Sequence, residues 1–372
     1  MSTDKPTMEQ WRRAYKLAGE VRDLAPWTWI YDNTYLGFVD PKNGTQHFIS
    51  VLGKAGEHFA ITVYRSAEDL FKILDLLDNP AAAPDTFFKT SQLQVSFDDR
   101  NDLDAADLRI IKTLKLSFRG KQAWPRFRSL LPGHVLWQLN SDELRLLCIA
   151  LEQVLIVAPR FKDDEDELGR LTDLGMEEHV FLMRTPLGQD PHGEWQESMV
   201  KVARPPTPEF FPELDEKRLE CVMRLPRAEG GFETDIRLLP NPIQDRKGER
   251  PYFPVVLMLV EQERGLVIGC EMMAPLPSLD SVYQCAAGLL LAMMVKEECR
   301  PEEIQVRTEQ MASLLRGLCE KLDIRLTVHS SLPLMEKAFF SLRDFSAGKW
   351  FSADIVQQWL AFDDGPIVVE EI

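Results

Sequence analysis

The spacing of apolar residues divides the first 160 residues into alternating helices and strands. Thr7 and Gln10 have the spacing of a capping box, and the apolar residues that follow predict a helix from about Met8 to Asp23. A second apolar helical face begins after Ser66, and a third helix is expected from about Ala105 to Leu114. The strongest pattern follows Asn140, where a continuous stripe predicts a long helix, formed by Leu144, Leu147, Cys148, Leu151 and Leu155.

Runs rich in aromatic and β-branched residues lie between these helices and predict strands. Segments 27–40 and 47–53 suit a hairpin, and segment 58–64 suits a third strand after the glycine turn at 53–56. That turn joins two strands and lacks a downstream GK[ST], so it does not indicate a phosphate-binding loop. We expect further strands at 91–97 and 134–139.

The composition changes at Phe161. The segment 161–208 is acidic, has two runs that predict strands and ends in a proline-rich stretch. We therefore expect it to be a connector between an N-terminal α+β domain, residues 1–160, and a second α/β domain, residues 209–346. Residues 347–372 are expected to form an ordered tail, because Ser352 suits a helix cap and nearby tryptophans suit docking.

The second domain has a clear order of elements. A short helix at about 213–224 and a short strand come first. A hairpin at 254–261 and 266–274 then precedes a helix at about 278–297, and strands at 303–307 and 324–329 alternate with two helices. The predicted class is therefore α+β, with two mixed α/β domains. The order resembles ribonuclease H-like folds, in which carboxylates from separate strands hold two metal ions. In that comparison Glu261 takes the first acidic position, whereas Arg307 stands where another carboxylate is usual, which opposes metal binding.

The composition excludes several classes. The 372 residues carry a net charge of -16, which argues against broad binding to nucleic acid. The six cysteines are dispersed without a CxxC pair, and the apolar run 286–295 is too short to span a bilayer. The first residues do not resemble a secretory signal. We therefore expect a cytoplasmic protein without membrane association, and nothing in the residues points to a cofactor.

One segment, residues 109–128, departs from this acidic background, and we call it the basic-aromatic segment. Between residues 109 and 128 the chain carries seven cations and no acid, interspersed with Phe118, Trp124 and Phe127. Such a segment could hold an acidic protein or a nucleic-acid strand, by stacking on aromatic rings and by cationic contacts. Alternatively the aromatic residues belong to the core and the cations pair with acids at 163–167. The candidate binding residues are Arg119, Lys121, Trp124, Arg126 and Arg128.

A polar face on the strand at 58–64 supplies weaker candidates. Alternation places His58, Thr62 and Tyr64 on one face, so His58 and Tyr64 are candidate site residues. A histidine without an identified partner is more often structural. The acidic and histidine clusters at 177–179 and 190–194 lack the spacing of a metal site, so no metal is expected.

Several motifs point to a family. The APW at 25–27, GxxGEHFAxxVY from Gly53 and FRGKxAWPxFRS from Phe118 resemble an uncharacterised bacterial family with two domains of unknown function. The resemblance implies no activity, cofactor or catalytic residue. The leading hypothesis is a non-enzymatic binding or interaction protein that uses the basic-aromatic segment. The alternative is a hydrolase or degenerate nuclease-like enzyme, with Glu261 or His58 as the reactive group.

Overall fold

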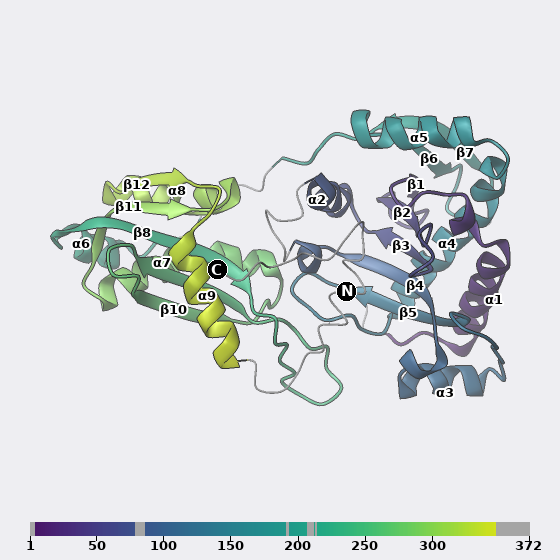
Figure 1. Cartoon of the computed structure of the whole chain (residues 1–372), viewed down its shortest axis with the longest axis horizontal. Helices are drawn as coiled ribbons and strands as arrows, with labels where there is room; N and C mark the ends of the chain where they lie inside the picture. Colours follow the sequence, from purple (N-terminus) through teal and green to yellow (C-terminus); the bar gives the residue numbers. More distant parts are fainter. Residues whose placement is uncertain (1–3, 79–85, 191–192, 207–211, 213, 347–372) are drawn as a thin grey trace.

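The computed structural model describes residues 4–78, 86–190, 193–206, 212 and 214–346. Within these ranges the chain forms two sheets, each with its own hydrophobic core (Figure 1). The first sheet has seven strands in the order β5-β4-β3-β2-β1-β6-β7, and the second has five in the order β10-β9-β8-β11-β12. The expected tail at 347–372 lies outside the described residues.

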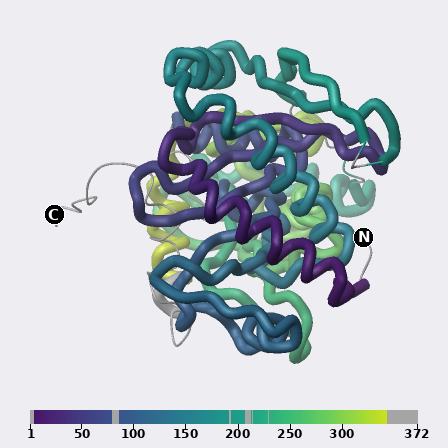
Figure 2. The backbone as a smooth tube through the Cα atoms, turned by 90° about the vertical axis from the view of Figure 1, so that its right-hand side faces the viewer, coloured from purple at the N-terminus to yellow at the C-terminus, as the bar shows by residue number. Residues whose placement is uncertain are grey.

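The first domain is an antiparallel sheet covered on both faces. All neighbouring strands run antiparallel except β1 and β6, which are parallel. The long helices α1 and α4 pack together on one face, while α2 covers the other, and Figure 2 shows α1 lying diagonally across the sheet. The strands are β1 (Tyr35–Val39), β2 (Gln46–Leu52), β3 (Ala60–Tyr64), β4 (Gln92–Asp98), β5 (Trp124–Leu130), β6 (Val180–Pro186) and β7 (Trp195–Lys201). The helices are α1 (Met8–Leu24), α2 (Ala67–Asp78), α3 (Ala105–Thr113), α4 (Ser141–Val157) and α5 (Glu165–Glu178).

The second domain is a mixed sheet between helices. Strands β8, β9 and β10 form an antiparallel meander, and β8 is also parallel to β11, which is parallel to β12. One face carries the buried residues of α6, α7 and α8, and α9 covers the other. In chain order the elements are α6 (Glu216–Met223), β8 (Arg227–Leu238), β9 (Val255–Glu261), β10 (Val267–Met273), α7 (Leu279–Lys296), β11 (Arg300–Val306), α8 (Glu309–Leu322), β12 (Arg325–Val328) and α9 (Pro333–Ser346).

The α+β class and most of the expected elements are confirmed. Thr7 and Asn140 both form capping boxes, at the starts of α1 and α4. Helix α7 is long and apolar enough by composition to cross a membrane, but half of its apolar window is buried inside the protein. Its buried residues belong to the core of the second domain, which is the role expected for the run 286–295.

Three expectations need correction. No strand forms at 134–139, where only isolated bridges occur; the strand is instead β5, within the basic-aromatic segment. The segment 161–208 differs from an acidic connector, because it contains helix α5, and its strands β6 and β7 extend the first sheet by pairing with β1 and with each other. The long strand β8 had been expected only as a short strand, and it lies at the centre of the second sheet.

The two domains meet at a backbone joint around Gly133. The Gly133 amide donates to the Phe88 carbonyl at 2.7 Å, and the Gly133 carbonyl accepts from the Phe253 amide at 2.8 Å. The rings of Phe88 and Phe253 pack at 4.8 Å between centroids. Gly133 has a φ of +74° and sits so close to Pro275 that an added Cβ would lie 2.8 Å from that side chain. Only glycine therefore fits this position without a shift of the joint.

We expect Gly133→Ala to lower the free energy of unfolding by about 1–3 kcal/mol more than Gly44→Ala, because a methyl group at 133 meets Pro275. Gly44 is a matched control, since its φ is +73° and no atom lies within 4 Å of an added Cβ. Urea denaturation of both variants measures the difference. Equal destabilisation would show that the close approach at the joint does not constrain the fold.

Candidate functional site

The aromatic half of the basic-aromatic segment is largely structural. Phe127 is 1% exposed and packs edge-on against Trp11 and Tyr15 of α1. Phe118 stacks on Tyr15 at 6.0 Å between centroids and lies against the same core. Trp124 is half-buried at the start of the edge strand β5. Strand alternation explains this arrangement, because Phe127 points toward the helices that cover the sheet.

Arg128 is part of a buried ion-pair network. Its guanidinium donates to both carboxylate oxygens of Asp107, at 2.9 and 2.6 Å, and to Asp104 at 3.0 Å. Burial alone would lower the pKa of Arg128, but the two carboxylates of α3 raise it. Asp104 and Asp107 also form the capping box of α3. Arg128 therefore fixes the start of α3 against β5 and is not available to a partner.

The other candidate cations differ in exposure. Arg126 is partly buried, and its Nη1 lies 3.5 Å from Oδ2 of Asp98 on the neighbouring strand. Arg119 and Lys121 are exposed in the loop between α3 and β5. The ion pairs of this segment are made with Asp98, Asp104 and Asp107, and the expected pairing with acids at 163–167 is not what the structure has. In that acidic stretch, Glu167 pairs with Arg170.

Four further exposed cations belong to the neighbouring segments of the chain. Arg109 and Lys112 lie three residues apart on α3, so they are neighbours on the helix surface, and Lys115 follows the C-cap residue of this helix. The guanidinium of Arg100 lies 5.8 Å from the centre of the Trp124 ring. We call this group the basic surface; it consists of Arg100, Arg109, Lys112, Lys115, Arg119 and Lys121. Among the described residues, no ion pair joins any member of the basic surface to an acid.

The two candidates on β3 and its preceding turn have different surroundings. Tyr64 is buried within the core formed with Tyr35 and Phe48, and burial raises its pKa well above the usual value. His58 is partly buried; burial lowers its pKa, nearby Asp98 opposes that effect and Arg126 adds to it. Tyr64 thus has the environment of a structural residue, and His58 lies in a mixed-charge setting.

Glu261 and Arg307, the two positions compared with ribonuclease H-like folds, do not lie side by side in the second sheet. Glu261 ends β9 opposite Phe232, whereas Arg307 follows β11 near the other end of β8. Strand β11 lies between β8 and β12, and its pairing with β8 brings Arg307 to the Asp235 carboxylate. Sequence reasoning missed Asp235, because it lies in the strand whose length was underestimated.

Asp235 is a buried carboxylate held by two arginines. Its Oδ2 accepts from Nε of Arg237 at 2.9 Å and from Nε of Arg307 at 3.1 Å, and its Oδ1 accepts from the Ile236 amide at 2.9 Å. The Asp235 side chain is 2% exposed. Within the described part of the chain, no group of three or more His, Cys, Asp or Glu side chains could hold a metal ion. Two cations at this carboxylate oppose a divalent cation there.

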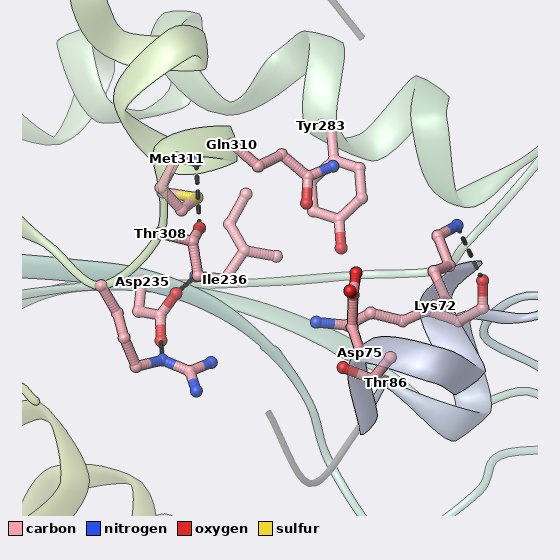
Figure 3. Close-up of a pocket in the computed structure, with 11 residues that line it drawn as sticks. Lys72, Asp75, Thr86, Asp235, Ile236, Tyr283, Thr308, Gln310 and Met311 are labelled. Carbon is pink, nitrogen blue, oxygen red and sulfur yellow. Dashed lines mark hydrogen bonds and ion pairs between the residues drawn. The ribbon is translucent and has the colours of Figure 1, made fainter. Parts of the chain in front are cut away.

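Asp235 borders a cleft between the two domains. Two adjoining pockets, with volumes of about 240 and 380 Å³, take side chains from α2 and the short helix Phe87–Lys89 on one wall and from α7 and α8 on the other. Both are lined by Lys72, Lys89, Tyr283 and Gln310. Figure 3 shows the smaller pocket, with Tyr283 and Gln310 facing Lys72, Asp75 and Thr86 across the space. No residue of this cleft was among the binding candidates from the sequence.

Comparison with known proteins gives domains without an assigned function. Residues 11–182 match the model of a domain of unknown function (DUF7309), and residues 218–343 match that of a second (DUF6930). The chain therefore carries two domains of unknown function, in agreement with the expected uncharacterised two-domain family. No curated protein matches it.

Among solved structures, one similar chain comes from the cryo-EM structure of the simian T-cell lymphotropic virus intasome in complex with PP2A regulatory subunit B56 gamma. It is 18% identical, the match covers 36% of this chain and 50% of that chain, and the TM-score is 0.23. A likeness at this TM-score supports no conclusion about fold or function.

We expect Arg128→Met to lower the free energy of unfolding by about 3–5 kcal/mol, because it leaves the buried Asp107 carboxylate without its cation. Arg126→Met, at a longer and more exposed ion pair on the same strand, is expected to cost about 1 kcal/mol or less. Urea denaturation of both variants measures the contrast. A small effect at Arg128 would mean that the pair with Asp107 does not hold α3 on the sheet.

Proposed function

We propose that this protein is a non-enzymatic binding protein whose first domain holds an acidic partner on the basic surface. The observation that supports this most is the lack of ion-pair partners for the six cations of the basic surface within the described chain. The protein has a net charge of -16, so a cluster of unneutralised cations is a local exception. Such a patch would steer and orient a partner of opposite charge.

The surface suits an acidic protein segment better than a nucleic-acid strand. Proteins that hold single strands stack successive bases on several exposed aromatic rings. Here Phe118 and Phe127 pack into or against the core, and the half-buried Trp124 already has the Arg100 guanidinium near its ring. Charge contacts alone remain, and these do not require bases.

The second domain supports a non-enzymatic interpretation as well. We infer a ribonuclease H-like arrangement for it, on the basis of the strand order β10-β9-β8-β11-β12 with β8, β11 and β12 parallel. Two-metal hydrolysis at such a sheet needs converging carboxylates. At the corresponding strand ends this chain has the ion pair of Asp235 with Arg307. We therefore favour binding over hydrolysis, and neither Glu261 nor His58 is assigned a catalytic role.

The test is a binding measurement with a fluorescent peptide of alternating Glu and Asp residues. We expect the triple variant Lys112→Glu, Arg119→Glu, Lys121→Glu to bind about tenfold more weakly or worse, since attraction becomes repulsion at three positions. Binding to the wild type is expected to weaken as salt increases, because exposed charges are screened. Fluorescence anisotropy at two salt concentrations measures both effects.

A control variant with the same change of net charge separates the basic surface from overall charge. Lys217→Glu, Lys247→Glu and Lys321→Glu alter exposed lysines of the second domain. We expect this control to keep most of the wild-type affinity. Equal loss in both triple variants, or no peptide binding by the wild type at low salt, would refute the proposal. Tighter binding of oligothymidylate than of the peptide would favour a nucleic-acid partner instead.

A further inference from the structure

The cleft between the domains lies where open α/β sheets bind their ligands. The chain continues from β8 to β9 on one side of the sheet and from β11 to β12 on the other, so the strand order reverses between β8 and β11. Asp235 lies toward the carboxyl end of β8, and Arg307 directly follows the carboxyl end of β11. Crevices at such a switch point, outside the carboxyl ends of parallel strands, are preferred ligand sites.

Among the described residues, the lining of the smaller pocket holds three cations and two acids. Lys72, Lys89 and Arg307 line it together with two carboxylates, Asp75 and Asp235, and the Lys72 ammonium also pairs with Glu68 at 2.8 Å. Each carboxylate is also bonded to a further arginine outside the lining: Asp75 to Arg204 at 2.8 Å and Asp235 to Arg237 at 2.9 Å. Helix α8, which is 14 residues long, begins at this pocket, and its first turn adds partial positive charge. This end of the cleft suits a dianion.

The larger pocket has the opposite character. Its walls include Asp69, Asp280 and His134, with the hydroxyl groups of Ser66 and Ser278 beside them. Asp69 is buried, and its oxygens accept from the Ser66 hydroxyl at 2.6 Å and from the Ser91 amide at 2.7 Å. Burial raises its pKa. Asp280 is exposed in the first turn of α7. Carboxylates arranged in this way accept hydrogen bonds from ligand hydroxyl groups.

We infer that the cleft binds a small phosphorylated polyol, such as a sugar phosphate or a nucleoside monophosphate. The phosphate would lie in the smaller pocket near Lys72, Lys89 and Arg307, and the hydroxyl groups would lie in the larger one near Asp69 and Asp280. The pockets share four lining residues, so one ligand can extend across both. Together the two pockets, of about 240 and 380 Å³, have the volume of a small-molecule site, roughly 300–1,000 Å³. This inference does not depend on the basic surface, which lies on other elements.

Isothermal titration calorimetry with ribose 5-phosphate, adenosine 5′-monophosphate and inorganic phosphate tests the inference on the full chain. We expect at least one of the two phosphate esters to bind the wild type more tightly than inorganic phosphate does. Lys72→Glu is expected to weaken that binding about tenfold or more, because it places a carboxylate at the wall shared by both pockets. Bound ligand should also raise the thermal unfolding midpoint of the wild type.

Lys16→Glu is the matched control. Lys16 and Lys72 each pair with a glutamate one helical turn away, Glu20 and Glu68, but Lys16 lies on α1, far from the cleft (Figure 1). We expect Lys16→Glu to bind like the wild type. Gln310→Trp, which fills the shared wall, provides a second variant if Lys72→Glu does not fold. The inference is overturned if neither ester binds, or if a folded cleft variant keeps the wild-type affinity. It is also overturned if inorganic phosphate binds as tightly as the esters do.

Discussion

The close contact at Gly133 is the constraint on which the arrangement of the two domains depends. Its amide and carbonyl bond to Phe88 and Phe253, which belong to different domains, and the space between its backbone and Pro275 leaves no room for a side chain. Because backbone groups make this contact, the joint is set by chain conformation more than by side-chain identity. The cleft lined by α2 and by the first turns of α7 and α8 follows from that geometry.

The fate of the basic-aromatic segment shows how one strand divides its residues between stability and binding. Arg128 and Phe127 both serve the fold, one through the carboxylates of α3 and the other through the rings of α1. That use of the strand leaves the cations of the neighbouring helix and loop in solvent. A segment rich in positive charge therefore offers a binding surface only through the part of its charge that the fold does not neutralise.

Local signals predicted local structure well, whereas pairing across the chain could not be predicted. The capping residues Thr7 and Asn140 and the apolar stripe of α4 act within a few residues, so α1 and α4 were correctly located. Arg128 finds its partners more than 20 residues away in α3, as the hydrogen bonds to Asp104 and Asp107 show. Asp235 meets Arg307 only after β8 and β11 pair. Asp104 and Asp107, as cap residues at the start of α3, were a signal that could have suggested the partner of Arg128.

The shared ownership of the cleft has a thermodynamic consequence. A ligand that touches Lys72 and Gln310 contacts both domains, so its site is complete only in molecules that have the contact at Gly133, which we call closed. The measured affinity is then the intrinsic affinity reduced by the fraction of closed molecules. By reciprocity, the ligand acts as a clamp that favours the closed arrangement. Each domain supplies one wall of the cleft, so a single domain on its own would lack the residues of the opposite wall.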